Sequence, residues 1–262
     1  MRKSKFTGLT VLCLFCFVAC ETNDAANEKL MVLFNGKNLD GWIVKIRNYP
    51  AGENFGNTFR VEDGILKVRY DAYETFDDRF GHIYTDTDYS HYKLTVEYRF
   101  TGDQVPGAPE WAWRNSGAML HAQAPEDLHQ DQDFPASIEA QMLGGDGENE
   151  RPTGNVCSPG TDIFINGAKV DDHCVNSTSK TYHGDQWVVM EMIVHADSAV
   201  HHIVNGDTVM TYTNITVDGK GLTPEAKVVP GPLKSGRIAL QSEGHPVDFK
   251  RVELIDLSPK KK

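Results

Sequence analysis

The chain has 262 residues, 40% of them hydrophobic and 24% charged, and a formal net charge of −11 at pH 7. This length suits one large all-β domain or two small ones, with a sizeable core. The acidic balance argues against binding to nucleic acid, and against electrostatic docking on anionic lipid.

The first 19 residues have the pattern of an export signal. Basic residues among the first five precede an apolar segment, 6–19, that is too short to span a membrane comfortably. The segment ends in Phe-Val-Ala-Cys20, which resembles a bacterial lipobox. We therefore expect a lipoprotein signal peptide over 1–19, a lipidated Cys20 and a flexible tether over 20–29. The protein would then lie in the cell envelope, in contact with the membrane only through its lipid anchor. The alternative is an ordinary secretory signal cleaved nearby.

From residue 30 the sequence consists of short alternating runs broken by Gly, Asn and Asp, without a long helical period. The run 92–100 is the clearest, because its odd and even positions separate polar from apolar side chains. Further strands are expected over 60–68 with a turn at Asp63-Gly64, 187–195, 201–212 with a turn at Asn205-Gly206, 236–243 and 247–257. The pattern predicts a single all-β domain over 30–258, a sandwich of two antiparallel sheets.

Two of the expected strands, 115–123 and 137–143, carry polar side chains on one face. Alternation puts His121 on the same face as Gly117, and Glu139 on the same face as Gln141. If the two strands pair, His121 and Glu139 form a candidate acid–base or metal-binding pair in a sugar site. The alternative is an ordinary solvated sheet face.

Two long segments without clear alternation, 101–114 and 143–182, flank these strands in sequence. The first carries Trp111 and Trp113, whose flat rings suit the apolar face of a sugar unless they simply pack in the core. Long ordered loops tend to be functional. Residues that would hold substrate from these loops and the neighbouring strands are Gln141, Arg151, Trp111, Trp113, Gln241, Glu243, His183 and His245, while His82 is interpreted as structural.

Apart from Cys20, the part of the chain beyond the export signal holds two cysteines, Cys157 and Cys174. In an exported protein they are expected to form a disulfide. A catalytic or metal-binding pair is the alternative, because His173 adjoins Cys174.

Several blocks together resemble one known family. The first, Val-Leu-Phe-Asn-Gly-Lys-Asn-Leu-Asp-Gly-Trp at 32–42, is followed in order by similar blocks at 61–66, 115–120, 138–141 and 236–241. They resemble the 3-keto-disaccharide hydrolase family, formerly a domain of unknown function, over about 31–257. The resemblance implies a concanavalin A-like jelly roll and action on glycosides oxidised at C3.

The implied chemistry is elimination. A ketone at C3 acidifies the C2 hydrogen, so a base removes that hydrogen, the group at C1 leaves, and water addition completes a net hydrolysis. His121 or Glu139 is the expected base, and a divalent metal at the enolate would take His121, Glu139 and His173 as candidate ligands. The alternative function is a non-catalytic carbohydrate-binding lipoprotein. A classical two-carboxylate glycosidase is disfavoured, because the expected strand reads Glu139-Ala-Gln141 rather than a run of acids.

Overall fold

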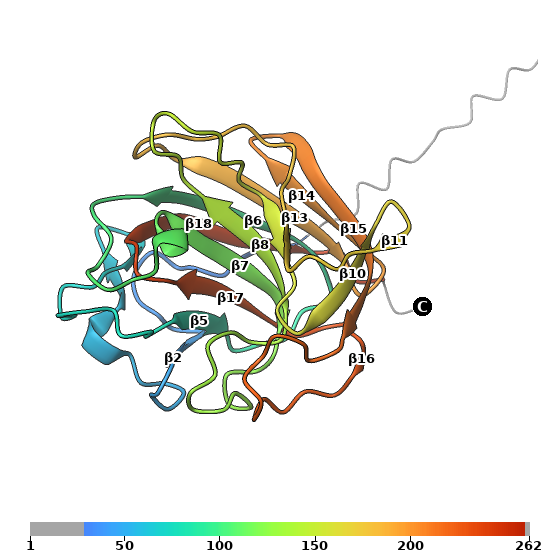
Figure 1. Cartoon of the computed structure of the whole chain (residues 1–262), viewed down its shortest axis with the longest axis horizontal. Coiled ribbons are helices and arrows are strands. Elements are labelled where there is room, and N and C mark those ends of the chain that lie inside the picture. The colour runs from blue at the N-terminus through green and yellow to red at the C-terminus, as the bar shows by residue number, and fades with distance from the viewer. Residues whose placement is uncertain (1–28, 260–262) are drawn as a thin grey trace, which may run out of the picture.

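A computed structural model describes residues 29–259, and these fold almost entirely into antiparallel strands (Figure 1). The expected signal peptide over 1–19 and the expected lipidation at Cys20 lie outside the described residues. Within 29–259, no helix is long and apolar enough to cross a membrane.

The strands form two sheets. The larger has eleven strands, in the order β11 (Ala168–Lys169), β10 (Thr161–Ile165), β15 (Asp207–Val217), β14 (Ala199–Val204), β13 (Val188–His195), β6 (His91–Phe100), β18 (Val247–Asp256), β4 (Ile65–Val68) and β3 (Phe59–Glu62), with β1 (Leu30–Val32) added on β18 and β16 (Gly231–Pro232) on β15. The smaller has seven, in the order β12 (Cys174–Val175), β9 (Asn155–Cys157), β8 (Ile138–Leu143), β7 (Asn115–Ala122), β17 (Arg237–Ser242), β5 (Gly81–Thr85) and β2 (Trp42–Ile46). Two single-turn 3-10 helices, η1 (Phe55–Asn57) and η2 (Glu110–Ala112), lie in loops.

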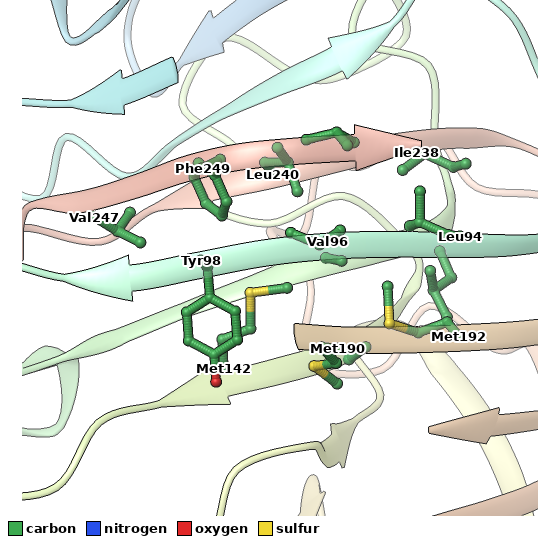
Figure 2. Packing of buried hydrophobic residues seen from close by; sticks show 14 of the residues in the cluster. Leu94, Val96, Tyr98, Met142, Met190, Met192, Ile238, Leu240, Val247 and Phe249 are labelled. Carbon is green, nitrogen blue, oxygen red and sulfur yellow. The ribbon is translucent and has the colours of Figure 1, made fainter. Parts of the chain in front are cut away.

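The core lies between the two sheets. Strand β6 buries every second residue, as its alternation predicts, and side chains of β6, β13 and β18 meet Met142, Ile238 and Leu240 of the smaller sheet (Figure 2). Each fully buried large apolar side chain contributes roughly 1.5–3 kcal/mol. Because one face of each sheet supplies this core, the opposite face of the smaller sheet is free to carry polar groups.

The structure confirms the predicted sandwich of two antiparallel sheets and the two predicted hairpin turns, which join β3 to β4 and β14 to β15. The segment 143–182 differs from expectation, since it contains β9, β10, β11 and β12 rather than continuous loop. Those strands have two to five residues each. Runs so short show almost no alternation, so the sequence pattern could not reveal them.

Candidate active site

A row of mostly polar residues crosses the face of the smaller sheet that points away from the core. Strand by strand, this polar row comprises Lys45, His82, Gln241, Gly117, Gln141 and Asn155. Strand β17 joins its two halves, because Leu240 pairs with Ala118 and the antiparallel register then brings Gln241 beside Gly117.

A cavity of about 360 Å³ opens over the β7–β9 half of the polar row. This volume is within the range of small-molecule sites. The cavity is lined by Trp111, Asn115, Phe134, Glu139, Gln141, Leu143, Arg151, Cys157, Pro159, His173, Cys174 and Glu243. The polar face predicted for Glu139 and Gln141 therefore lines a cavity and is not a flat, solvated sheet surface.

Glu139 extends from β8 across Gly117 of β7. A Cβ atom at position 117 would lie 2.5 Å from Oε1 of Glu139 and 2.7 Å from its Cγ, so only glycine leaves room for this carboxyl. Glu139 is 6% exposed, and burial raises its pKa to about 8. Burial in this low-dielectric site thus favours the protonated form of the carboxyl, and so perturbed a group in a cavity is a candidate for proton transfer.

Glu243 is the second carboxyl of the cavity. It lies just beyond the end of β17, is 3% exposed, and has no hydrogen-bond partner for its Oε2 among the described residues. Burial, and then the charge of Glu139, raise the pKa of Glu243 well above its ordinary value, against the opposing influence of Arg151. Two buried carboxyls that interact in this way titrate as a pair, and the second proton is harder to remove than the first.

The loop that bears Trp111 is held over the cavity by two polar side chains. Arg151 donates through Nη2 to the carbonyl oxygen of Trp111 at 3.2 Å and through Nη1 to those of Arg114 and Gly144. Asn115 donates to the same Trp111 oxygen at 3.4 Å, which leaves its own Oδ1 buried and unpaired.

The indole of Trp111 is 53% exposed and stacks on Phe80, with ring centroids 5.8 Å apart. A flat, exposed aromatic ring at a cavity mouth suits the C–H face of a pyranose. Trp111 therefore lines the same cavity as Glu139, and its expected role in holding a sugar stays a prediction.

The opposite wall contains the disulfide. Cys157 and Cys174 are bonded and pair across β9 and β12, which confirms the predicted bond. Cys157 also lies opposite Glu139, so the bond fixes the strand next to the carboxyl. Nearby, Asn155 donates from Nδ2 to Oε1 of Gln141 at 2.9 Å and orients that amide.

Replacing both Cys157 and Cys174 by alanine should lower activity as well as stability. The bond closes a separation of 17 residues, for which loop entropy predicts a loss of about 3 kcal/mol. Release of β12 would also shift the cavity wall, and small misplacements in a site cost about 100-fold in rate. Urea unfolding and turnover of the double variant check this. Wild-type turnover together with a large loss of stability would show that the bond serves the fold alone.

His121 does not lie in this cavity, so the expected pairing with Glu139 is wrong. Strand β7 has a β-bulge at this point. Met119 and Ala122, three residues apart, pair with Ala239 and Arg237 of β17, which are only two residues apart. His121, inside the bulge, has a φ of +51°. The bulge breaks the alternation and turns the imidazole to the ring of Tyr92, 5.7 Å away, and to the carbonyl of Leu233. Burial lowers the pKa of His121 to about 4, as for a neutral structural histidine.

Four other expected substrate contacts lie outside the cavity lining. Trp113 packs edge-on against buried His245 beneath Arg151. His183 accepts a hydrogen bond from the backbone of Gly147, and Gln241 is buried in the polar row beside the cavity.

The expected metal ligands are also separated. His173 and Glu139 line the cavity, whereas His121 lines a different one. Among residues 29–259, no three His, Cys, Asp or Glu side chains are grouped as metal ligands. The proposed trio does not fit a divalent metal.

Sequence reasoning missed Asn115 and Phe134. Asn115 is two residues before Gly117, so alternation puts both on the same face of the expected strand. That spacing could have identified Asn115 as a site residue. Phe134 lies in the 123–137 loop, where no periodicity indicates the direction of a side chain.

The model of the 3-keto-alpha-glucoside-1,2-lyase-like domain matches residues 29–255. A proposed glycosyl hydrolase from Parabacteroides distasonis ATCC 8503 superimposes with a TM-score of 0.51 at 18% identity, over 87% of this chain and 100% of that chain. A second one from the same organism gives 0.50 at 19% identity, over 87% and 84%. A Bacillus subtilis protein of unknown function with a galectin-like fold gives 0.51 at 12% identity, over 83% and 90%. No curated protein matches. At these identities the structural likeness concerns the fold, and it agrees with the jelly roll that the family resemblance implies.

Proposed function

This chain belongs to the 3-keto-alpha-glucoside-1,2-lyase-like family, and we propose that it cleaves 3-keto-glycosides during bacterial glycan breakdown. The observation that carries the proposal is the buried pair Glu139 and Glu243 in one cavity beneath an exposed Trp111. A ring stacked on the indole would present its polar edges to the two carboxyls.

In the proposed reaction, ionised Glu139 takes the C2 proton, and the electron pair of the C–H bond forms the enolate of the C3 ketone. The enolate then expels the oxygen at C1, which leaves an enone, and Glu243 gives its proton to that departing oxygen. Water addition across the C1–C2 double bond converts the elimination into a net hydrolysis. Raised pKa values suit both roles, because a base works best with a pKa near the working pH and an acid must keep its proton until it is needed.

A non-catalytic carbohydrate-binding lipoprotein is the competing function. Trp111, Asn115 and Gln141 would serve that function equally well. The two buried carboxyls would not, since each loses hydration and neither gains a salt bridge within the described residues. The description of two structural neighbours from P. distasonis as proposed glycosyl hydrolases agrees with the enzyme.

The deciding assay compares p-nitrophenyl 3-keto-glucoside with the unoxidised p-nitrophenyl glucoside, in both anomers. The elimination route predicts release of nitrophenol from the keto substrate alone, with deuterium from the solvent entering C2. Equal cleavage of both substrates would indicate an oxocarbenium route, and binding without cleavage would indicate the carbohydrate-binding protein.

We also propose that the protein acts in the cell envelope, anchored through a lipid on Cys20. The basis is the sequence pattern of residues 1–20. The Cys20→Ser variant, expressed in a Gram-negative host, should move from the membrane fraction to the soluble fraction, because the multiple acyl chains of a lipoprotein provide its attachment. Unchanged fractionation would contradict the anchor. The Cys174→Ala variant, which keeps Cys20, is the control and should stay with the membrane.

A further inference from the structure

The polar row continues beyond the cavity into a covered region. Its β17 and β5 members are Gln241 and His82, and Tyr84 follows His82 on the same face of β5. All three side chains are at most 1% exposed. They do not line the cavity, yet Gln241 lies beside Gly117, over which Glu139 extends.

These three residues hold a concentration of unpaired polar atoms. Both amide atoms of Gln241, Nε2 of His82 and the hydroxyl of Tyr84 have no hydrogen-bond partner in the described part of the chain. Buried polar groups are normally paired, so four unpaired atoms in neighbouring positions of one sheet face require an explanation. Apolar residues of similar shape would fill this region without that cost.

The cover over this region is the β7–β8 loop, residues 123–137. At one end of the cover, Phe134 lines the cavity and lies against His82, with ring centroids 6.1 Å apart. Four residues earlier, in the middle of the loop, the carbonyl of Gln130 accepts hydrogen bonds from Nζ of Lys45 and from the backbone of Asn48. The loop therefore crosses the His82 end of the polar row, and Phe134 separates that end from the cavity.

We propose that His82, Tyr84 and Gln241 form a second subsite, for the neighbouring sugar ring of a di- or oligosaccharide, which opens when the β7–β8 loop lifts Phe134. The proposal rests on the proposed function only in taking the ligand to be a carbohydrate. Each of the three side chains can both donate and accept a hydrogen bond, as sugar hydroxyls do. A neutral ring suits them, because burial lowers the pKa of His82 to about 3 and keeps its imidazole uncharged.

The test uses unoxidised probes, namely glucose and the disaccharides cellobiose, maltose and trehalose, with calorimetric titration. At least one disaccharide should bind wild-type protein about ten-fold or more tightly than glucose. Tyr84→Phe and Gln241→Met should each lower that preference by about five-fold, the worth of one hydrogen bond. Neither should lower Tm, because each removes polar atoms that have no partner.

Tyr98→Phe is the matched control. Tyr98 is as buried as Tyr84, but its hydroxyl bonds Oγ1 of Thr153 at 2.7 Å. This variant should lose stability and keep the wild-type preference for disaccharide. Hydrogen exchange provides a second readout, since a disaccharide, and not glucose, should speed exchange in residues 123–137.

Two results would overturn the subsite. One is a wild-type protein that binds no disaccharide more tightly than glucose. The other is a pair of variants, Tyr84→Phe and Gln241→Met, that keep the wild-type preference, whether or not they lose Tm. If the variants lose both the preference for disaccharide and Tm, hydrogen exchange in the wild-type protein decides. Faster exchange of residues 123–137 with disaccharide supports the subsite, and unchanged exchange counts against it. Because no probe carries a ketone, failure here leaves the cleavage assay unaffected.

Discussion

Glu139→Gln lowers turnover of a 3-keto-glucoside by about two to four orders of magnitude, the usual worth of a positioned base, and leaves the sandwich folded. Glutamine has nearly the same shape and keeps the packing over Gly117, but it cannot accept the C2 proton. The expected loss is therefore in kcat, with a small change in KM. Steady-state kinetics with the keto substrate, together with deuterium exchange at C2, measures it. Exchange should disappear in the variant even where substrate still binds.

The matched control is Glu191→Gln on the opposite sheet, where Glu191 pairs with Lys93 on the half-buried outer face of the strands. It makes the same carboxyl-to-amide replacement far from the cavity and should keep wild-type turnover. If Glu139→Gln retains full turnover or full C2 exchange, Glu139 is not the base. If both variants lose activity equally, the loss does not come from the cavity.

The fold could be predicted because its long strands obey a simple physical rule. In β6 one face meets the core and the other is partly exposed, so apolar and polar residues alternate. The neighbouring β13 also buries every second residue, but Val189 and Ile193 make its outer face less polar. Turns such as Asn205-Gly206 mark where such strands reverse, since both residues tolerate a positive φ. The short strands β9 to β12 lack this signal and owe their existence to neighbouring strands and to the disulfide.

The site could be predicted only where β8 is regular. Glu139 and Gln141 are two apart on an unbroken strand, and they do share the cavity. The same two-residue alternation put His121 on the face of Gly117, but a bulge at His121 turns its side chain to the other face of the sheet. Gly236 is the local sign of that bulge, because a Cβ at 236 would lie 2.5 Å from the carbonyl carbon of His121. The contact of Gly236 with the end of β7 can be recognised only when the pairing register of β7 and β17 is known.

The contribution of Glu243 also depended on tertiary structure. Its position after β17 places it on the polar face, but its neighbours Arg151 and Glu139 come from other segments of the chain. Sequence pattern indicated a polar residue near a sugar site. The pairing of the two carboxyls, on which the proposed base and acid roles depend, follows only from the sheet order β8–β7–β17.

Glu243→Gln should reduce turnover in a way that depends on the leaving group. If Glu243 protonates the departing oxygen, a methyl 3-keto-glucoside, whose alkoxide leaves poorly, should lose about two to four orders of magnitude in kcat. The p-nitrophenyl compound, whose oxygen needs little protonation, should lose far less. If kcat falls equally on both substrates, Glu243 does not act as the acid and only binds substrate.

The same pair should make activity and stability respond oppositely to pH. A carboxyl whose pKa is raised on folding keeps its proton in the folded state while the unfolded chain has lost it. The folded state then binds more protons between the ordinary pKa and the raised one. For Glu139 this interval runs from 4.5 to about 8, and within it the free energy of unfolding should fall by about 1.4 kcal/mol per pH unit. Activity should rise over the same interval as Glu139 ionises, and fall at higher pH when Glu243 loses its proton.

Buried histidines of lowered pKa, such as His82 and His202, change stability in the opposite direction below pH 6.5, so the comparison must be made between variant and wild type. Urea unfolding at pH 5, 7 and 8.5 should show Glu139→Gln and Glu243→Gln gaining stability over wild type as pH rises, with little difference at pH 5. Neutral glutamine keeps the cavity filled without a charge to desolvate. A constant difference across this range would mean that neither carboxyl holds its proton in the folded protein. The assignment of Glu139 as a base tuned by burial would then fail together with that of its partner.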